Sequence, residues 1–231
     1  MEHIERILRN NAAWADEMTR GDPEFFASRA REQAPHFLFI GCSDSRVPAE
    51  QLTGVLPGEM FIHRNIANQV FATDLNLLSV LQYGIEVLEI EHLIVCGHYD
   101  CGGVKAAMGS GSHGLVDNWL AGIRNVIRWH EHELAAVRDE DARLRRLVQL
   151  NVRQQVYNLS RVPIVQNAWR QGPRPLLHGF VYDIHDGLLD SVVLGVTGEQ
   201  GAAALLPDEQ LADGKRAAPP VAERGSRRSR S

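Results

Sequence analysis

The segment "HFLFIGC" (residues 36–42) is a short apolar run that ends in a cysteine, and "EHLIVCGH" (residues 91–98) is a second run of the same kind. Continuous apolar runs of this length are typical of strands that are buried on both faces of a parallel sheet. Between them, "TDLNLLSVLQYGIEVL" (residues 73–88) predicts a helix capped by Thr73 or Asp74. The order strand, helix, strand predicts a parallel crossover.

The residues before and between these runs add two helices and another extended segment. Asp22 and Pro23 predict the N-cap and first position of a second helix, and "MFIHRNIAN" (60–68) predicts a strand or extended segment. An amphipathic helix is predicted at the N-terminus from the spacing of Ile4, Ile7, Leu8, Trp14 and Met18. We therefore expect a helical arm ahead of the first strand.

The second half of the chain predicts two long helices, over 118–137 and 139–161, and a short strand in "VPIVQNAW" (162–169). The segment 176–196 reads as two strands around a His-Asp-Gly turn. The predicted fold is α/β, with a mostly parallel central β-sheet flanked by helices, an N-terminal helical arm and an antiparallel edge strand. We expect one domain over residues 1–212.

Charge is distributed unevenly along the chain. The formal net charge is −5, but residues 213–231 carry +4, which leaves −9 on residues 1–212. A body this acidic does not resemble a nucleic-acid surface. The tail is rich in Pro, Ser and Arg, so we expect it to be disordered. An alternative is that the tail binds RNA or anionic lipid.

The composition favours a cytoplasmic protein with no membrane partner. No stretch approaches the roughly 18–20 apolar residues that a spanning helix needs, and charges interrupt the N-terminal segment, unlike a secretory signal. The three cysteines, Cys42, Cys96 and Cys101, form an odd and sparse set. This argues against a disulfide framework and favours metal ligation or catalysis.

Three of these side chains suit a metal ion. Cys42 and His98 each end a predicted strand, and the carboxyl ends of parallel strands are where ligands bind in such sheets. Cys101 follows His98 by three residues. Two thiolates and an imidazole suit zinc, and three protein ligands leave the fourth position open, as in catalytic sites. Taken singly, each could instead be an ordinary buried side chain, which is our interpretation of Cys96.

Asp44 and Arg46 follow Cys42 closely. A carboxylate beside the metal could orient a bound hydroxide, or could bind the metal itself and block the site. An arginine two residues away could hold that carboxylate off the metal. "SDSR" could therefore form a switch; the alternative is an ordinary ion pair in a tight turn.

These motifs carry a family resemblance. "CSDSR" (42–46) and "CGHYDCGGV" (96–104), at this separation, resemble the β class of carbonic anhydrases, and "PGEMFIHRNIAN", "LQYGIEVL" and "HGFVYDIHDG" resemble that family's other segments. The resemblance covers roughly residues 1–200. It implies zinc-dependent, reversible hydration of carbon dioxide to bicarbonate and a proton by zinc-bound hydroxide. It also implies a homodimer or a dimer of dimers.

The resemblance assigns roles to single residues. Cys42, His98 and Cys101 match the zinc ligands, one zinc per chain, and Asp44 with Arg46 matches the catalytic dyad. Gly102 matches the position whose backbone N–H holds the substrate. The substrate pocket, to which a neighbouring subunit contributes in this family, is matched by Gln33, Phe61, Ile66 and Tyr83.

The chain also resembles a subgroup that is inhibited by bicarbonate at a second site. Arg64 and Tyr182 match that site, but Phe39 stands where the subgroup has tryptophan, which removes one donor to the anion. Asp100 lies beside a ligand, where its charge could raise the pKa of zinc-bound water; a solvated loop aspartate is the alternative. His63, His113 and His185 are candidates for carrying the proton outward, with nothing in the sequence to choose among them.

Two other functions remain open at this point. A related zinc hydrolase acting on carbon disulfide or carbonyl sulfide would share every ligand. A bicarbonate-responsive, non-catalytic zinc protein would keep Asp44 permanently on the metal.

Overall fold

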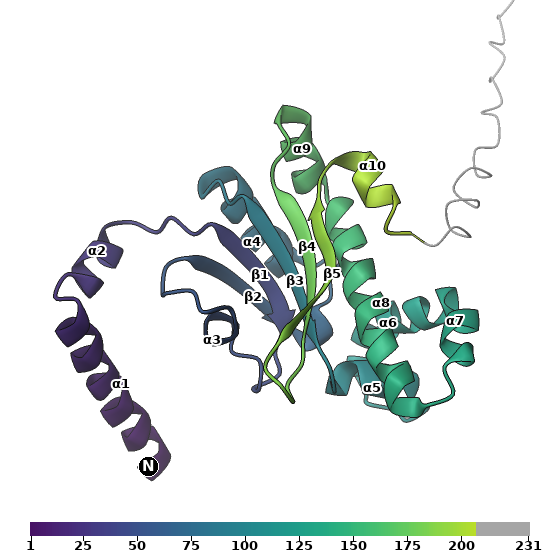
Figure 1. Ribbon diagram of the computed structural model, residues 1–231, viewed down its shortest axis with the longest axis horizontal. Helices are drawn as coiled ribbons and strands as arrows, with labels where there is room; N and C mark the ends of the chain where they lie inside the picture. The colour runs from purple at the N-terminus through teal and green to yellow at the C-terminus, as the bar shows by residue number, and fades with distance from the viewer. Residues whose placement is uncertain (207–231) are drawn as a thin grey trace, which may run out of the picture.

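The computed structural model describes residues 1–206, which build one five-stranded sheet with helices around it (Figure 1). The strands are β1 (Phe37–Cys42), β2 (Met60–Asn65), β3 (His92–His98), β4 (Leu176–Tyr182) and β5 (Leu189–Val196). The helices are α1 (Glu2–Gly21), α2 (Phe25–Arg31), α3 (Ala49–Thr53), α4 (Leu75–Gln82), α5 (Gly102–Met108), α6 (Val116–Trp129), α7 (Glu131–Ala136), α8 (Glu140–Ser160), α9 (Pro163–Gln171) and α10 (Gly198–Ala203), with a 3₁₀ helix, η1 (Ile66–Asn68), and a π-helical turn, η2 (Tyr83–Val87). The predicted tail, 213–231, lies outside the described residues.

The strand order is β2-β1-β3-β4-β5, and every pair is parallel except β4 with β5. The predicted fold class is therefore confirmed, including the antiparallel edge strand. The register places Gly41 beside Cys96, and His98 beside Tyr182. The carboxyl ends of β1 and β3 consequently lie next to each other at one end of the sheet.

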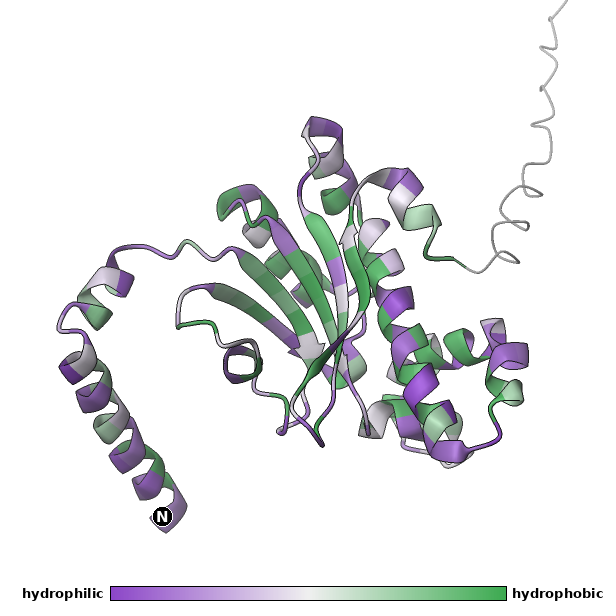
Figure 2. Cartoon of the chain, in the orientation of Figure 1, coloured by the Kyte–Doolittle hydropathy of each residue, from purple (hydrophilic) through white to green (hydrophobic). Residues whose placement is uncertain are grey.

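The larger core lies between the sheet and its helices, and the strands are the most continuously apolar elements (Figure 2). Helix α8 packs closely across β3 and β4: a Cβ on Gly97 would lie 2.7 Å from Val152, and one on Gly179 would lie 2.9 Å from the same side chain. Only glycine permits this approach. A smaller cluster around Phe39 and Cys96 covers the other face, beside α3.

The predicted strand over 162–169 is wrong, because this segment is helix α9. Pro163 occupies the first helical turn, where its missing N–H costs nothing, and the buried Val165 is followed by Trp169 one turn later. The β-branched residues of this segment suggested a strand, but the apolar spacing is helical.

The boundaries of other predicted helices also differ. Helix α2 begins at Phe25, because the Asp22 carboxylate accepts the Glu24 N–H in a turn and does not cap the helix. Asp74, rather than Thr73, caps α4 by accepting from two backbone N–H groups. The segment 118–137 contains two helices, α6 and α7, that separate at His130.

The predicted N-terminal arm is present and projects from the body (Figure 1). Helix α1 has no buried residue, and Ile4, Ile7 and Leu8 are each more than half exposed. Within residues 1–206, no helix combines the length and apolar character needed to cross a membrane.

Candidate metal centre

The three predicted ligands meet at the carboxyl end of the sheet. Cys42 is the last residue of β1, His98 is the last of β3, and Cys101 is the N-cap of α5. Their ligand atoms all lie within 4.8 Å of one another, and all three residues are buried. The two Sγ atoms are 3.9 Å apart. Parallel pairing of β1 with β3 therefore brings together residues that are far apart in the sequence.

His98 is oriented toward the two thiols. Its Nδ1 lies 2.8 Å from the carbonyl oxygen of Tyr99, which can only accept a hydrogen bond, so Nδ1 carries the proton and Nε2 carries the lone pair. Nε2 is fully buried and has no hydrogen-bond partner among residues 1–206. A buried polar atom without a partner is costly unless something binds it. Two thiols and this nitrogen make a donor set that fits zinc.

One of the two thiols already favours a negative charge. A hydrogen bond from the Cys101 thiol is the largest cause that lowers the pKa of Cys42 to about 4, and the same contact raises the pKa of Cys101. The Ala67 N–H also points to Cys42 Sγ, at 3.4 Å. Metal binding needs both sulfurs as thiolates. Cys42 is readily deprotonated, and the positive charge of a bound cation would stabilise the thiolate of Cys101.

Sequence reasoning missed the polar network that holds Ala67 in place. Ala67 and Asn68 have φ values of 60° and 49°, which are unusual for residues with side chains. The Ala67 carbonyl accepts hydrogen bonds from Gln69 Nε2 (2.8 Å) and Asn151 Nδ2 (3.2 Å), and Gln155 Nε2 donates to Asn151 Oδ1 (3.0 Å). Two amides four residues apart on the buried side of the predicted helix 139–161 were the available signal.

Asp44 lies beside the ligands and accepts two side-chain hydrogen bonds from Arg46. Its Oδ1 accepts from Arg46 Nε at 2.9 Å and its Oδ2 accepts from Arg46 Nη2 at 2.8 Å. These hydrogen bonds hold the pKa of the Asp44 carboxyl well below its usual range. Asp44 Oδ2 is also 3.6 Å from His98 Nε2. The carboxylate is thus held charged at the edge of the ligand cluster.

Two of the predicted pocket residues lie at this end of the sheet. Gly102 is the first residue of α5, and nothing stands within 4 Å of the position that a Cβ would take there. Ile66 is half-exposed and contacts Gly103, where an added Cβ would lie 3.0 Å from Ile66 Cγ2. An open, partly apolar space therefore adjoins Cys101.

The other three predicted pocket residues lie elsewhere in this chain. The rings of Phe61 and Tyr83 are 6.0 Å apart, and Phe61 pairs with Leu38 near the start of β1. Gln33 precedes β1, whereas Cys42 ends it, and a six-residue strand spans about 20 Å. One copy of the chain does not bring these residues to the ligands.

The predicted regulatory residues occupy two environments. Phe39 is buried, and Tyr182 packs against the same cluster. Arg64 is exposed and donates to the carbonyl oxygens of Cys42 (2.6 Å) and Asp44 (2.7 Å). Arg64 therefore braces the segment that carries the ligand and the carboxylate.

Cys96 behaves as the sequence suggested. It is fully buried within β3, outside the ligand cluster, and burial raises its pKa to about 12. Cys96 is therefore an uncharged packing residue.

The three histidines that are candidates for carrying the proton outward differ in position. His63 is buried in β2 and lies 3.3 Å from Asn65 Nδ2, and His113 faces Asp117 in the loop after α5. His185 lies in the β4–β5 turn with its Nε2 2.7 Å from Asp100 Oδ2.

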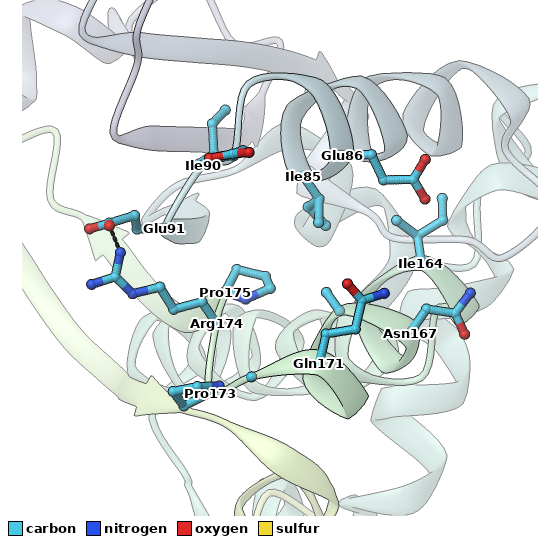
Figure 3. Close-up of a pocket in the computed structure, with 13 residues that line it drawn as sticks. Ile85, Glu86, Ile90, Glu91, Ile164, Asn167, Gln171, Pro173, Arg174 and Pro175 are labelled. Carbon is cyan, nitrogen blue, oxygen red and sulfur yellow. Dashed lines mark ion pairs between the residues drawn. The ribbon is translucent and has the colours of Figure 1, made fainter.

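A cavity of about 520 Å³ lies at the opposite end of the sheet, beside α9 and η2 (Figure 3). Glu91 and Pro175, which immediately precede β3 and β4, line it, and Glu91 forms an ion pair with Arg174. None of its lining residues is a cysteine or a histidine. This cavity is not the metal centre.

Comparison with known proteins points to one family. A family model described as carbonic anhydrase matches residues 37–189. A carbonic anhydrase of Emericella nidulans is 43% identical over 194 residues, which cover 84% of this chain and 85% of that protein. A Coccomyxa β-carbonic anhydrase, solved in complex with acetazolamide, superposes with a TM-score of 0.85 at 37% identity, covering 93% of this chain and 98% of that one. A tetrameric β-carbonic anhydrase of Sordaria macrospora gives a TM-score of 0.80 at 37% identity, covering 84% and 99%.

Proposed function

Because this chain belongs to the β-class carbonic anhydrase family and is a carbonic anhydrase, we propose that Cys42, His98 and Cys101 hold one zinc ion for the reversible hydration of carbon dioxide. The observation that carries the site assignment is the buried His98 Nε2, which has no partner among residues 1–206 and lies within 4.8 Å of the two thiol sulfurs. Bound zinc supplies a Lewis acid that lowers the pKa of water toward neutrality, so that a hydroxide nucleophile is available.

The residues around the ligands supply orientation. Asp44 accepts a proton of the reacting water in a hydrogen bond, which turns an oxygen lone pair toward the carbon of carbon dioxide. Arg46 keeps that carboxylate charged and in place through two hydrogen bonds. The backbone N–H of Gly102 donates to a substrate oxygen, and Ile66 forms part of an apolar wall suited to a small apolar molecule.

A second copy of the chain completes the pocket in this proposal. Gln33, Phe61 and Tyr83 stand apart from the ligands within one chain, and Tyr83 is 44% exposed. In the apolar stripe of α1, Trp14 packs on Phe25 and Phe26, but Ile4, Ile7 and Leu8 are each more than half exposed. An isolated helix of this kind gains most of its stability from packing. We propose a homodimer, or a dimer of dimers, in which the neighbouring copy supplies these three residues.

Inhibition by bicarbonate is a second proposal, favoured by the position of Asp44. Its Oδ2 is 3.6 Å from His98 Nε2, so a small rotation away from Arg46 would add the carboxylate to the ligand set. Bicarbonate bound near Phe39, Arg64 and Tyr182 would draw the Arg64 guanidinium away from the Cys42 and Asp44 carbonyls that it now contacts. Loss of these hydrogen bonds would allow the segment that carries Cys42 and Asp44 to move.

Stopped-flow hydration of carbon dioxide by metal-quantified protein, from about pH 6.5 to 9, tests the function. We expect one zinc per chain and activity that rises with pH. Inhibition by bicarbonate at constant ionic strength, beyond product inhibition, would support the Asp44 switch; simple product inhibition would remove it.

Parallel assays with carbon disulfide and carbonyl sulfide test the related hydrolase. Zinc-loaded protein without turnover at any pH would favour the non-catalytic zinc protein instead.

We further propose that residues 1–212 form the zinc domain of a cytoplasmic protein, since the sparse, unpaired cysteines suit a reducing compartment. Deletion of 213–231 should leave hydration and zinc content unchanged. A loss of either would give the basic tail a role.

A further inference from the structure

We propose that His185 accepts the proton released by the hydration reaction and passes it to buffer, and that Asp100 positions the His185 imidazole for this transfer. The inference rests on the proposed function. It starts from a hydrogen bond between two residues 85 positions apart: His185 Nε2 lies 2.7 Å from Asp100 Oδ2.

This pair lies at the surface beside the metal centre. Arg46 Nη2 donates both to Asp44 Oδ2 (2.8 Å) and to the Asp100 carbonyl oxygen (3.3 Å). Asp100 itself lies two positions after the ligand His98 and one position before the ligand Cys101. The side chain of His185 is 70% exposed, so its imidazole can reach bulk solvent.

The hydrogen bond selects the nitrogen that receives the proton. With Nε2–H donated to the Asp100 carboxylate, the lone pair of neutral His185 is on Nδ1. Two hydrogen bonds also fix the β4–β5 turn that carries His185. The His185 backbone N–H donates to Asp183 Oδ1 at 3.0 Å, and Asp183 accepts from Arg145 at 2.8 Å. Asp100 has a φ of 56°, so its carboxylate is presented from a constrained backbone.

Several charged groups surround the His185 imidazole. The Asp100 carboxylate faces it from the loop after β3, 2.7 Å from Nε2. Asp183 and Asp186 lie in the same turn, and Arg145 neutralises Asp183. Arg46 stands beyond Asp100 and pairs with Asp44, so its positive charge is already compensated.

The proton balance is simple. Carbon dioxide and water give bicarbonate and one proton, which crosses solvent to His185 Nδ1, while the Nε2 proton stays on its hydrogen bond to Asp100. A buffer base then removes the proton from Nδ1 and restores neutral His185. Histidine suits this role because it is the side chain that ordinarily exchanges a proton between pH 5 and 8.

Neither of the other two candidates has this arrangement. His63 is buried, and His113 faces Asp117, whose carboxylate is already engaged by Arg124 at 2.7 Å. The His113–Asp117 pair is nevertheless an exposed histidine beside an aspartate, with a side-chain exposure of 44% for His113. It therefore provides a matched control.

The test compares H185Q and D100N with H113Q in the zinc-loaded full chain. In dilute, weakly accepting buffer, we expect H185Q to lower kcat by about a hundredfold, the low end for groups that transfer protons, and to leave kcat/KM unchanged. Added imidazole should restore kcat. D100N should lower kcat less, and H113Q should change neither constant.

A second measurement does not depend on turnover. The ¹⁵N shifts of His185 should show the Nε2–H form in the wild type and a mixture of ring tautomers in D100N. Parallel loss of kcat and kcat/KM without rescue by imidazole, or an unchanged kcat in H185Q, would overturn the proposal. A wild type that holds zinc but does not hydrate carbon dioxide would instead overturn the proposed function, and this role with it.

Discussion

The two ends of the parallel sheet differ in whether their polar groups have partners. At the amino ends of β3 and β4, a cavity of about 520 Å³ has Glu91 paired with Arg174 (Figure 3). At the carboxyl ends, the three ligand residues are buried, His98 Nε2 has no partner among residues 1–206, and two thiols face it.

This difference shows which end binds an ion. Polar groups that already satisfy one another gain little from a ligand, whereas a buried nitrogen without a partner gains a bond. The presence of a cavity alone therefore does not identify the metal centre of this molecule. The predictions below test each end in turn, beginning with the largest effect.

Removing a ligand should abolish function. In C42A, we expect almost no bound zinc and hydration reduced by about a thousandfold or more, because the metal's effect on the pKa of water is lost. Metal analysis and stopped-flow assays measure this.

The matched control is C96A. It should retain zinc and activity, with a loss of stability from the cavity of about 1–2 kcal/mol. Because the pKa of Cys96 is about 12, this thiol should also resist alkylation at pH 8 in the folded protein. Loss of zinc in C96A would contradict the assignment of ligands.

Asp44 should matter for turnover more than for metal content. D44N should retain zinc and lose about a hundredfold in kcat/KM, since an amide cannot accept the proton of the reacting water with the strength of a carboxylate. D117N is the control, because Asp117 also pairs with an arginine, Arg124, at 2.7 Å. A fully active D44N would remove the proposed role of the carboxylate.

The polar network behind η1 should stabilise both the fold and the ligand site. N151L leaves Gln69 Nε2 and Gln155 Nε2 without their shared acceptor, Asn151 Oδ1. We expect a loss of about 2 kcal/mol, roughly 4–8 °C in Tm for a chain of this size, and zinc affinity weakened by about tenfold.

The control for this network is N167L, which makes the same change on the exposed surface of α9 at the opposite end. It should leave Tm and zinc affinity almost unchanged. Equal effects of N151L and N167L would show that the network does not support the ligands.

The smallest effect is expected at the amino ends of the strands. E91Q removes the carboxylate partner of Arg174, whose side chain is 61% exposed, so stability should change by no more than about 0.5 kcal/mol. Hydration should be unchanged. A large loss of activity in E91Q would assign a function to the cavity of Figure 3.

Much of the ligand set could be predicted because the ligands lie at the ends of buried strands. A buried parallel strand is a continuous apolar run, so its last residue can be located in the sequence, and adjacent strands end at the same side of the sheet. Cys42 and His98 follow from this pattern, and Cys101 follows from its spacing to His98. The segment 162–169 shows the limit, because a short apolar run with β-branched residues also suits a buried helix.

Contacts between distant segments could not be predicted in this way. The hydrogen bond from Ala67 to Cys42 requires a left-handed backbone at Ala67, which amides on α8 support. The pairing of His185 with Asp100 depends on how the β4–β5 turn lies against the loop after β3.

The sequence by itself determined the α/β class, the order of most elements, and the residues able to bind a metal, because these depend on local periodicity and on chemistry carried by single side chains. The tertiary structure decided which nitrogen of His98 is free, how Arg46 grips Asp44, and which histidine has an aspartate beside the metal centre. Those features are set by distances of a few ångströms between segments that meet only when helices and strands pack together.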